Sequence, residues 1–458
     1  MSWRNIGKDD LDVMLGEPKR AVRSLALALA FSYLIIQLNT YIDTYWTTGL
    51  GDVAMSAVAA MSPIYWIVSS IGIGLGVGAS STMAYRIGQG DHTRAGLLGS
   101  NAVLLGIGSS MVMGVAVFLL LDPMISLIGA DEIRDECFSY AIPFALMSTA
   151  LVVNGIIAGL LRSEGSRAKS MGILVLSAAT NIILDPVLMY QMGMGVAGAG
   201  WATCIGSALS CIPALWWYFS GKMRIKLDRS NFRFDVSASK EVLNVGAPRT
   251  AEALVTGVTN VLQRIFIVIA GGTMGLMLYN VPFRYATLIV VIAEALGAAM
   301  IPVCSAAIGQ KDIARMHTGM RYAVSLSFVL TSVLAVVAFV FADPLMGVFI
   351  NSESMEQHCE ELVAVMRMFC IFIPFDGLRK IGSCMLQVVR RSRLSSIAVL
   401  VWGGAKLVCY WAACTVSFDA LIIAAVAVYV AGGLWMTGLG FLSAKKFERE
   451  KLGDSPAA

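Results

Sequence analysis

Charged side chains are scarce in this chain of 458 residues, since Asp, Glu, Lys and Arg together make up 14% of it. A typical soluble protein carries about 25% charged residues. Hydrophobic residues here reach 57%, so the composition excludes a soluble globular protein and predicts an integral membrane protein. The apolar segments run for about 20 residues or more, the length of a spanning helix, which excludes a barrel of short alternating strands.

Residues that bind metals or form disulfides are also few. The three histidines are scattered along the chain, and the nine cysteines show no CxxC spacing and lie mostly within apolar runs. Such cysteines are typical of packing positions. With no paired histidines and no constellation around a nucleophile, we expect a protein that is not an enzyme and needs no cofactor. A net charge of +4 is too small to indicate a nucleic-acid partner.

Twelve apolar segments predict twelve transmembrane helices. The longest polar interruption, residues 221–240, divides the chain into an N-lobe (1–220) and a C-lobe (241–458), with a cytoplasmic linker between them. The predicted segments are residues 20–48, 53–85, 95–121, 136–161, 168–190, 196–220, 241–270, 275–308, 317–341, 359–389, 395–417 and 419–443.

An internal repeat supports this division. The pattern Ile87-Gly-Gln-x-Asp-x-x-Arg94 recurs as Ile308-Gly-Gln-x-Asp-x-x-Arg315, and Asp122-Pro123 recurs as Asp343-Pro344. Because six helices bring each half back to the side on which it began, the two lobes should be related by a pseudo-two-fold axis along the membrane normal. The expected fold is all-α, with twelve transmembrane helices in two six-helix lobes.

Lysine and arginine are concentrated in alternate connectors. The side that holds both termini receives nearly all of them, including the stretch from Lys222 to Arg249, whereas the opposite side holds Arg134 and the acidic stretch 343–361. The positive-inside rule then predicts a multi-pass protein of the plasma (inner) membrane with both termini in the cytoplasm. We expect a monomer in the lipid bilayer.

Asn181-Ile-Ile-Leu-Asp185-Pro186 places an amide and a carboxylate inside an apolar segment. An ionisable residue in hydrocarbon costs at least about 2.5–3.5 kcal/mol and therefore calls for a partner or a function. Asn181 and Asp185 are four residues apart and share one helix face. Pro186 has no N–H to offer the carbonyl group of Ile182, so that oxygen is free and the helix has a yielding point here. The group suits a small cation or a proton.

The first apolar segment carries a second set of polar residues, Gln37, Asn39 and Asp43, and Thr203 lies in the sixth. A purely structural interpretation gives each of them one interhelical hydrogen bond, worth about 0.6 kcal/mol on average. Two carboxylates in a lobe without buried basic partners favour a functional site instead. A carboxyl group in such surroundings can take up and release a proton.

Taken together, these motifs resemble those of the multidrug and toxic compound extrusion (MATE) transporters, over nearly the whole chain and most closely in the archaeal and DinF-like branch. The resemblance implies a twelve-helix, two-lobe transporter that exports organic cations against an inward flow of H⁺ or Na⁺. The motifs that carry it are Asp43-x-x-Trp46-x-x-Gly49, Gly74-x-Gly76-x-Gly78, Leu161-Arg162-x-Glu164-Gly165, Asn181 to Pro186, and Gly195-x-x-Gly198-Ala199-x-x-Ala202-Thr203.

The resemblance also implies roles for individual residues. Asp43, Asn181, Asp185 and Thr203 match the N-lobe cation site, which is also the place for a Na⁺ ion, and Pro186 is the expected hinge. Tyr140, Gln37 and Asn39 are expected on the wall of the substrate cavity. In the C-lobe, Pro374-Phe375-Asp376-Gly377 is similar to the acidic motif of the NorM branch. Asp376, Glu252 and Arg284 therefore mark either a second cation site or a structural ion pair, and Arg379 is another candidate partner for Asp376.

The sequence thus predicts secondary active multidrug efflux by exchange of a drug for H⁺ or Na⁺, with small organic cations or amphiphilic drugs as substrates. The alternative is a flippase for a lipid-linked or amphiphilic substrate, which would require several basic residues at mid-depth in the N-lobe. An ion channel would need a symmetric ring of charge, which the sequence lacks.

Overall fold

The computed structural model describes residues 6–225, 227, 232–347 and 357–453, and the described residues are helical with no strand. Parts of the expected linker (226 and 228–231) and of the acidic stretch (348–356) lie outside the described residues. In the N-terminal half the elements are α1 (Ile6–Leu15), α2 (Pro18–Thr48), α3 (Asp52–Gly88), α4 (His92–Ile128), η1 (Asp131–Ile133), α5 (Arg134–Leu146), α6 (Ser148–Ser163), α7 (Arg167–Pro186), η2 (Val187–Gln191) and α8 (Val196–Phe219). In the C-terminal half they are α9 (Val236–Gly309), α10 (Ile313–Val340), α11 (Ala342–Gly347), α13 (Cys359–Val388), α14 (Ser392–Cys414) and α15 (Phe418–Gly453).

Twelve crossings account for these helices, as the sequence predicts. Ten are long and apolar enough to span a membrane, counting α9 as two because its backbone breaks at Gly272 (φ 63°). The eleventh is the pair α5 and α6, which bends by 53°. The twelfth is α13, whose 30 residues suffice for a span although it carries Arg367, Asp376 and Arg379 within its length.

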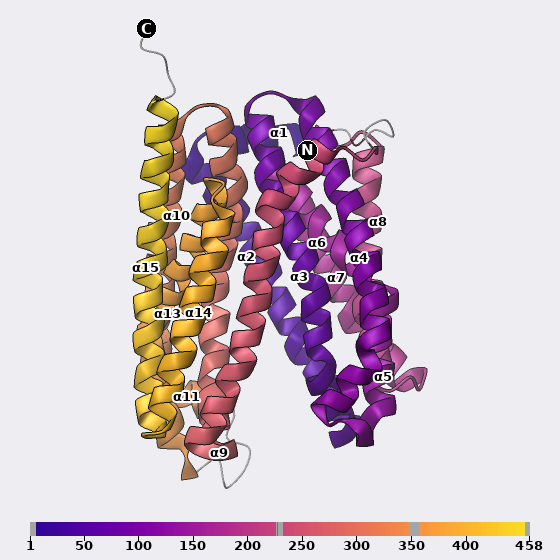
Figure 1. Cartoon of the computed structure of the whole chain (residues 1–458), viewed down its shortest axis with the longest axis vertical. Coiled ribbons are helices and arrows are strands. Elements are labelled where there is room, and N and C mark those ends of the chain that lie inside the picture. Colours follow the sequence, from indigo (N-terminus) through magenta and orange to yellow (C-terminus); the bar gives the residue numbers. More distant parts are fainter. Residues whose placement is uncertain (1–5, 226, 228–231, 348–356, 454–458) are drawn as a thin grey trace.

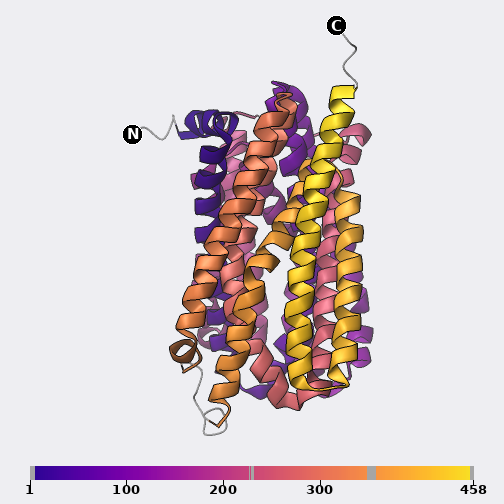
Figure 2. The same ribbon diagram turned by 90° about the vertical axis from the view of Figure 1, so that its left-hand side faces the viewer.

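The two halves form separate helix bundles that approach each other at one end. Figure 1 shows the purple N-terminal helices and the orange C-terminal helices side by side near the termini and diverging toward the opposite end. Figure 2 shows that both termini lie at the same end, which we call the terminal end. An even number of crossings requires this placement.

Glycines allow the two bundles to touch at the terminal end. A Cβ atom at Gly78 of α3 would lie 2.6 Å from the carbonyl oxygen of Val242 in α9, and one at Gly74 would lie 2.7 Å from that of Gly246. Both distances are too short for any side chain, so the backbones of α3 and α9 meet directly. The alternating glycines of the sequence therefore serve close helix packing, as small residues do in membranes.

Charged residues close the same end. Glu241 of α9 pairs with Arg86 (3.0 Å) and Arg94 (3.8 Å) from the N-terminal half and with Arg390 (3.3 Å) from its own half. A hydrogen bond between Ser81 and Ser305 (3.2 Å) joins the halves one step further into the bundle.

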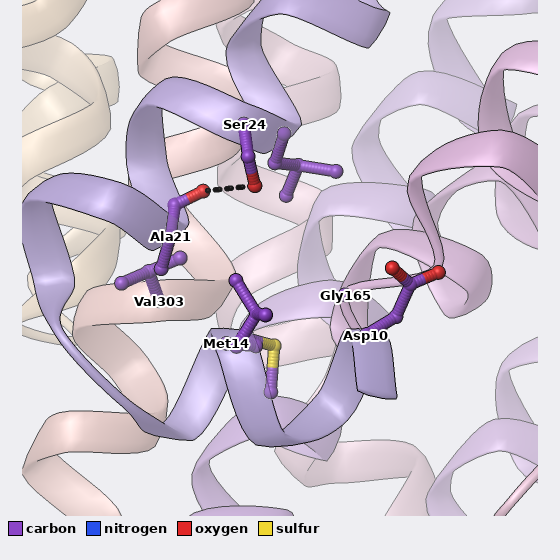
Figure 3. Close-up of a pocket in the computed structure, with 8 residues that line it drawn as sticks. Asp10, Met14, Ala21, Ser24, Gly165 and Val303 are labelled. Atoms are coloured by element: carbon purple, nitrogen blue, oxygen red, sulfur yellow. Dashed lines mark hydrogen bonds between the residues drawn. The ribbon is translucent and has the colours of Figure 1, made fainter. Parts of the chain in front are cut away.

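The short helix α1 bridges the two halves across this end. Its Asp10 accepts hydrogen bonds from Arg167 of α7 (2.7 Å), and the backbone oxygen of Met14 accepts one from Arg315 of α10 (2.9 Å). Figure 3 shows Asp10 and Met14 of α1 beside Gly165 and Val303 of neighbouring segments, which line one small cavity with them. The cavity that they line measures about 10 Å³, roughly enough for one water molecule, so this face is packed closed.

Glu164 fastens the start of the linker to the terminal end. Its side chain lies outside the spanning helices and is 2% exposed, and its Oε2 accepts hydrogen bonds from the backbone N–H groups of Arg224 (3.0 Å) and Ile225 (3.2 Å). Burial raises the pKa of Glu164 to about 7, although these two donors act in the opposite direction.

This raised pKa predicts a loss of stability as the pH rises. Between about pH 4.5 and 7 the folded protein holds a proton on Glu164 that the unfolded chain has released, so unfolding is favoured with increasing pH and the effect levels off above pH 7. We measure melting temperatures in detergent from pH 5 to 8 for the wild type and for Glu164→Gln. As the pH rises, we expect the wild type to lose stability relative to the variant, by up to about 3 kcal/mol of unfolding free energy. Parallel curves for the two proteins would contradict this role of Glu164.

Candidate functional site

The helices of the N-terminal half bring four polar residues of the sequence prediction into one cluster. Asp43 comes from α2, Asn181 and Asp185 from α7, and Thr203 from α8. The side-chain nitrogen of Asn181 donates to Asp185 (3.3 Å) and to Thr203 (3.3 Å), and Thr203 in turn donates to the carbonyl oxygen of Ala199 (3.0 Å). Asp185 is fully buried and Asn181 is 3% exposed, whereas Asp43 and Thr203 are partly exposed, so the cluster is buried on its α7 side and accessible on the other.

Asn39 connects the two aspartates through Asn181. Its side-chain nitrogen donates to Asp43 (3.1 Å) and to the side-chain oxygen of Asn181 (2.6 Å). Asn39 was expected on the cavity wall, whereas the structure makes it part of the cluster. The signal was present in the sequence, because Asn39 and Asp43 repeat the four-residue spacing of Asn181 and Asp185.

Three oxygen atoms of the cluster are buried without a hydrogen-bond partner among the described residues: one each from Asn39, Asp43 and Asp185. A buried acceptor without a donor is costly, by about 1–3 kcal/mol for a neutral group and more for a charged one. The cluster is therefore arranged to receive a positive charge, either a proton or a cation with oxygen ligands.

The helix geometry around Pro186 offers a backbone carbonyl group to such a ligand. Helix α7 ends at Pro186, and the chain continues as a single π-helical turn, η2. Proline removes the hydrogen bond to the Ile182 carbonyl, and π-turns inside helices are frequent at functional sites. Tyr190 of η2 donates a hydrogen bond to the backbone oxygen of Trp46 in α2, so the two helices that hold the aspartates are also joined beyond Pro186.

The expected cavity residues Tyr140 and Gln37 differ in their surroundings. Tyr140 of α5 packs edge-on against Phe144, with 5.2 Å between ring centroids, and its backbone oxygen lies against Gly200 of α8, three residues before Thr203. Gln37 is half-buried, and its side chain has no hydrogen-bond partner among the residues that the structure describes. Tyr140 therefore borders the cluster, and Gln37 stays outside its hydrogen-bond network.

The structure does not bring the three C-lobe candidates together. Asp376 accepts a hydrogen bond from Arg379 (2.7 Å) of the same helix, α13. Glu252 pairs with Arg249 (3.3 Å) and accepts hydrogen bonds from the side chains of Ser383 (2.6 Å), Ser395 (3.2 Å) and Gln387 (3.4 Å).

Arg284, the third candidate, is exposed and lies over the ring of Tyr41 in the N-terminal half, 5.9 Å from its centroid. Asp376 and Glu252 thus have separate basic partners. Of the two alternatives left open for this trio, these contacts favour structural ion pairs over a second cation site.

The described part of the chain contains no group of three or more His, Cys, Asp or Glu side chains that could hold a metal ion. The N-lobe cluster supplies two carboxylates, two amides and one hydroxyl. Such an all-oxygen donor set fits a hard monovalent cation rather than a transition metal.

Comparisons with known proteins agree with this architecture. The family model MatE matches residues 28–187 and 251–408. The multidrug export protein MepA of Staphylococcus saprophyticus is 23% identical over 84% of both chains, and the FAD transporter of Shewanella oneidensis is 24% identical over 72% of this chain and 74% of its own. A solved outward-facing structure of a multidrug resistance MATE family transporter superposes with a TM-score of 0.91 at 22% identity, covering 96% of this chain and 98% of that one.

The contacts of Asn39 predict that it contributes more to stability than its neighbour Gln37. Asn39→Ala removes two hydrogen bonds, and such bonds in membrane proteins contribute about 0.6–1.7 kcal/mol each. We expect this variant to lose about 1–3 kcal/mol of unfolding free energy, measured by SDS titration in bicelles. Gln37→Ala is the matched control and should stay within about 0.5 kcal/mol of the wild type. Equal losses in the two variants would place Asn39 outside the cluster.

Proposed function

The chain belongs to the MatE family, whose members are membrane transporters and not enzymes, and from this membership we propose that it exports small organic cations or amphiphilic drugs in exchange for Na⁺ or H⁺. The observation that carries the exchange is the N-lobe cluster, where two carboxyl groups and an amide retain unpartnered, buried oxygen atoms. The names of the MepA relatives support multidrug export. The polar pattern of the N-lobe supports placement in the archaeal and DinF-like branch.

The proposed mechanism is alternating access between the two lobes, residues 1–220 and 241–458, which residues 221–240 link. Contacts between the lobes at the terminal end, namely the glycine backbones and the arginines around Glu241, support a state open at the opposite end. With the termini in the cytoplasm, as the distribution of basic residues favours, that opposite end faces outward. The working unit is a monomer in the plasma (inner) membrane.

Binding of the coupling ion then drives drug release. A Na⁺ ion or a proton that enters from outside compensates one negative charge of the Asp43–Asp185 pair and draws α2 and α7 around the unpartnered oxygens. Pro186 and the π-helical turn η2 provide the point where α7 yields. Since the ion and a cationic drug carry the same sign, occupation of the cluster by one disfavours the other. This competition in one lobe is the physical basis of exchange.

The cluster offers more oxygen ligands than a proton alone would need, and this favours Na⁺ as a ligand. A hard cation prefers oxygen ligands, and the cluster offers unpartnered oxygens from Asn39, Asp43 and Asp185 together with the hydroxyl of Thr203 and the carbonyl group freed at Ile182. Amide and hydroxyl groups do not titrate near neutral pH, so a site for protons only would have less use for them. We propose that Na⁺ and H⁺ compete for this site.

A flippase for a lipid-linked amphiphile is the alternative function. It would place several basic residues around a central cavity, but the N-lobe cluster is acidic and the buried basic side chains near a cavity, Arg379 and Lys406, belong to the C-lobe. Exchange assays in proteoliposomes with separate Na⁺ and H⁺ gradients distinguish the two functions, because a flippase would move lipid without a counter-ion.

Loss of either carboxylate should abolish export. Asp43→Asn and Asp185→Asn each remove a negative charge that the coupling ion needs, and we expect an efflux-deficient host to lose drug resistance with either variant while the protein is produced normally. Asp52→Asn, at an exposed position at the start of α3, is the control and should retain resistance. Undiminished resistance in both cluster variants would refute the proposal.

Na⁺ binding should depend on pH and on the central amide. By calorimetry from pH 8 to 5, we expect the Na⁺ affinity to weaken as protons compete for Asp43 and Asp185. Asn181→Ala should abolish binding because it releases the side chains of Asn39, Asp185 and Thr203. Asp376→Asn should leave binding largely intact. A pH-independent affinity, or a loss confined to the Asp376 variant, would move the site to the C-lobe.

A further inference from the structure

The C-terminal half contains a cavity of about 130 Å³ between α9, α13, α14 and α15. Its size is close to that of an engineered protein cavity of about 150 Å³ that binds benzene, so it can hold one aromatic ring with a small substituent. It is too small for a whole drug-sized molecule, which occupies roughly 300–1,000 Å³. The side chains that the argument uses are Asn260, Phe283, Phe372, Arg379, Trp402 and Tyr429, all on its wall.

The buried or partly buried charged side chains of α9 and α13 are each paired with a residue of opposite charge. Arg249 pairs with Glu252 (3.3 Å), Arg379 pairs with Asp376 (2.7 Å), and Lys380 pairs with Glu294. These pairs lower the cost of keeping charges away from water, which is otherwise several kcal/mol per ion.

Lys406 of α14 is different. Its side chain is fully buried, and no carboxylate of the described residues lies within 4.0 Å of its ammonium group. The ammonium group donates instead to two neutral amide oxygens, those of Gln263 (2.9 Å) and Asn260 (3.1 Å). These bonds orient the group without cancelling its charge. A buried, uncompensated charge at membrane depth indicates a functional site by default.

The ammonium group of Lys406 lies directly behind the cavity wall. Asn260, which accepts its hydrogen bond, lies on the cavity wall, and so does Trp402, whose ring centroid is 5.1 Å from the ammonium nitrogen. The guanidinium carbon of Arg379 lies 4.3 Å from the same ring. Arg379 and Asp376 on the wall cancel each other, and Lys406, behind Asn260 and Trp402, adds one positive charge in its protonated form, which a bound anion would favour, so the net charge is then +1 (2 − 1).

Arg379 retains capacity for a further acceptor. Within the described part of the chain, Nε is the atom of its guanidinium that makes a hydrogen bond, to Asp376. The terminal nitrogens, which carry the donors suited to a carboxylate, remain uncommitted. Asp376 does not repel an incoming anion strongly, because its own charge is held by Arg379.

We propose that this cavity binds the anionic group of an aromatic ligand, an aryl carboxylate. Lys406 and Arg379 provide the counter-charge, and the rings of Phe283, Phe372 and Tyr429, which pack on one another, form the apolar wall against which the aromatic portion lies. A monoanion matches the net charge of +1, whereas a phosphate dianion would leave one negative charge uncompensated. The site is separate from the N-lobe cluster. This inference rests on the proposed function in one respect: a transported amphiphile would present its aryl carboxylate group to this cavity. Binding of an aryl carboxylate here is measurable without any transport.

The test is binding of two probes of nearly equal shape to the purified, full-length protein in detergent. ¹⁹F NMR titrations compare 4-fluorobenzoate with its neutral counterpart 4-fluorobenzamide. We expect the benzoate to bind at least ten-fold more tightly. Asn260→Asp, an isosteric change that gives Lys406 a carboxylate partner, should reduce benzoate binding to the level of the benzamide. Ala286→Leu, which fills part of the cavity, should weaken both probes.

The control is Asp43→Asn in the N-lobe. It should keep the ten-fold preference for benzoate even though the proposed exchange requires this residue, so failure of the transport proposal and failure of the anion site are distinguishable. Equal affinities of the two probes for the wild type would overturn the inference, and this comparison needs no variant to fold. A preference that survives unchanged in a folded Asn260→Asp protein would overturn it as well.

Discussion

Hydrocarbon offers no hydrogen-bond partners, and this constraint determines most of the structure. Every backbone polar group at membrane depth must be satisfied within its own helix, which explains a chain that is helical throughout its described spans. Three departures from regular helix stand out in the described residues. They are the break at Gly272 in α9, the bend between α5 and α6, and the π-helical turn after Pro186. The same constraint makes each buried polar side chain informative, because it needs a partner inside the protein.

The two lobes meet this constraint in opposite ways. In the N-lobe, two carboxyl groups share amide donors and still leave acceptor oxygens unpartnered, so the lobe has an excess of negative character. In the C-lobe, carboxylates are matched by arginine or lysine, and Lys406 leaves an excess of positive character. The internal repeat therefore describes the helix architecture, and the chemistry of the two halves has diverged.

Several features were predictable from sequence because they depend on local spacing. The twelve spans follow from apolar length. The grouping of Asn181, Asp185 and Thr203 follows from a four-residue spacing and a family motif. The direction of the Asn39 side chain depends instead on how α2 is rotated against α7, which no local pattern encodes. The pairing of Asp376 with Arg379 was one of two open alternatives, and Arg284 contacts Tyr41 instead. The full burial of Lys406 depends on how the helices of this half pack around it. Its position within an apolar segment of the sequence therefore did not indicate the neighbouring cavity.

The direct backbone contact between α3 and α9 limits the ways in which ions can leak between the two bundles. In the proposed exchange, the ion gradient is dissipated whenever an ion crosses without cargo, for example through a transient opening between side chains. At Gly78 the neighbours of the Cβ position are backbone atoms of α9 alone, so no side chain there could rotate to open a file of water, and at Gly74 the space is filled by the Thr250 hydroxyl and the carbonyl oxygen of Gly246. The barrier on this side is as rigid as the helices themselves. It can be breached only when the two bundles move apart as bodies, so that passage of an ion is tied to the complete conformational step.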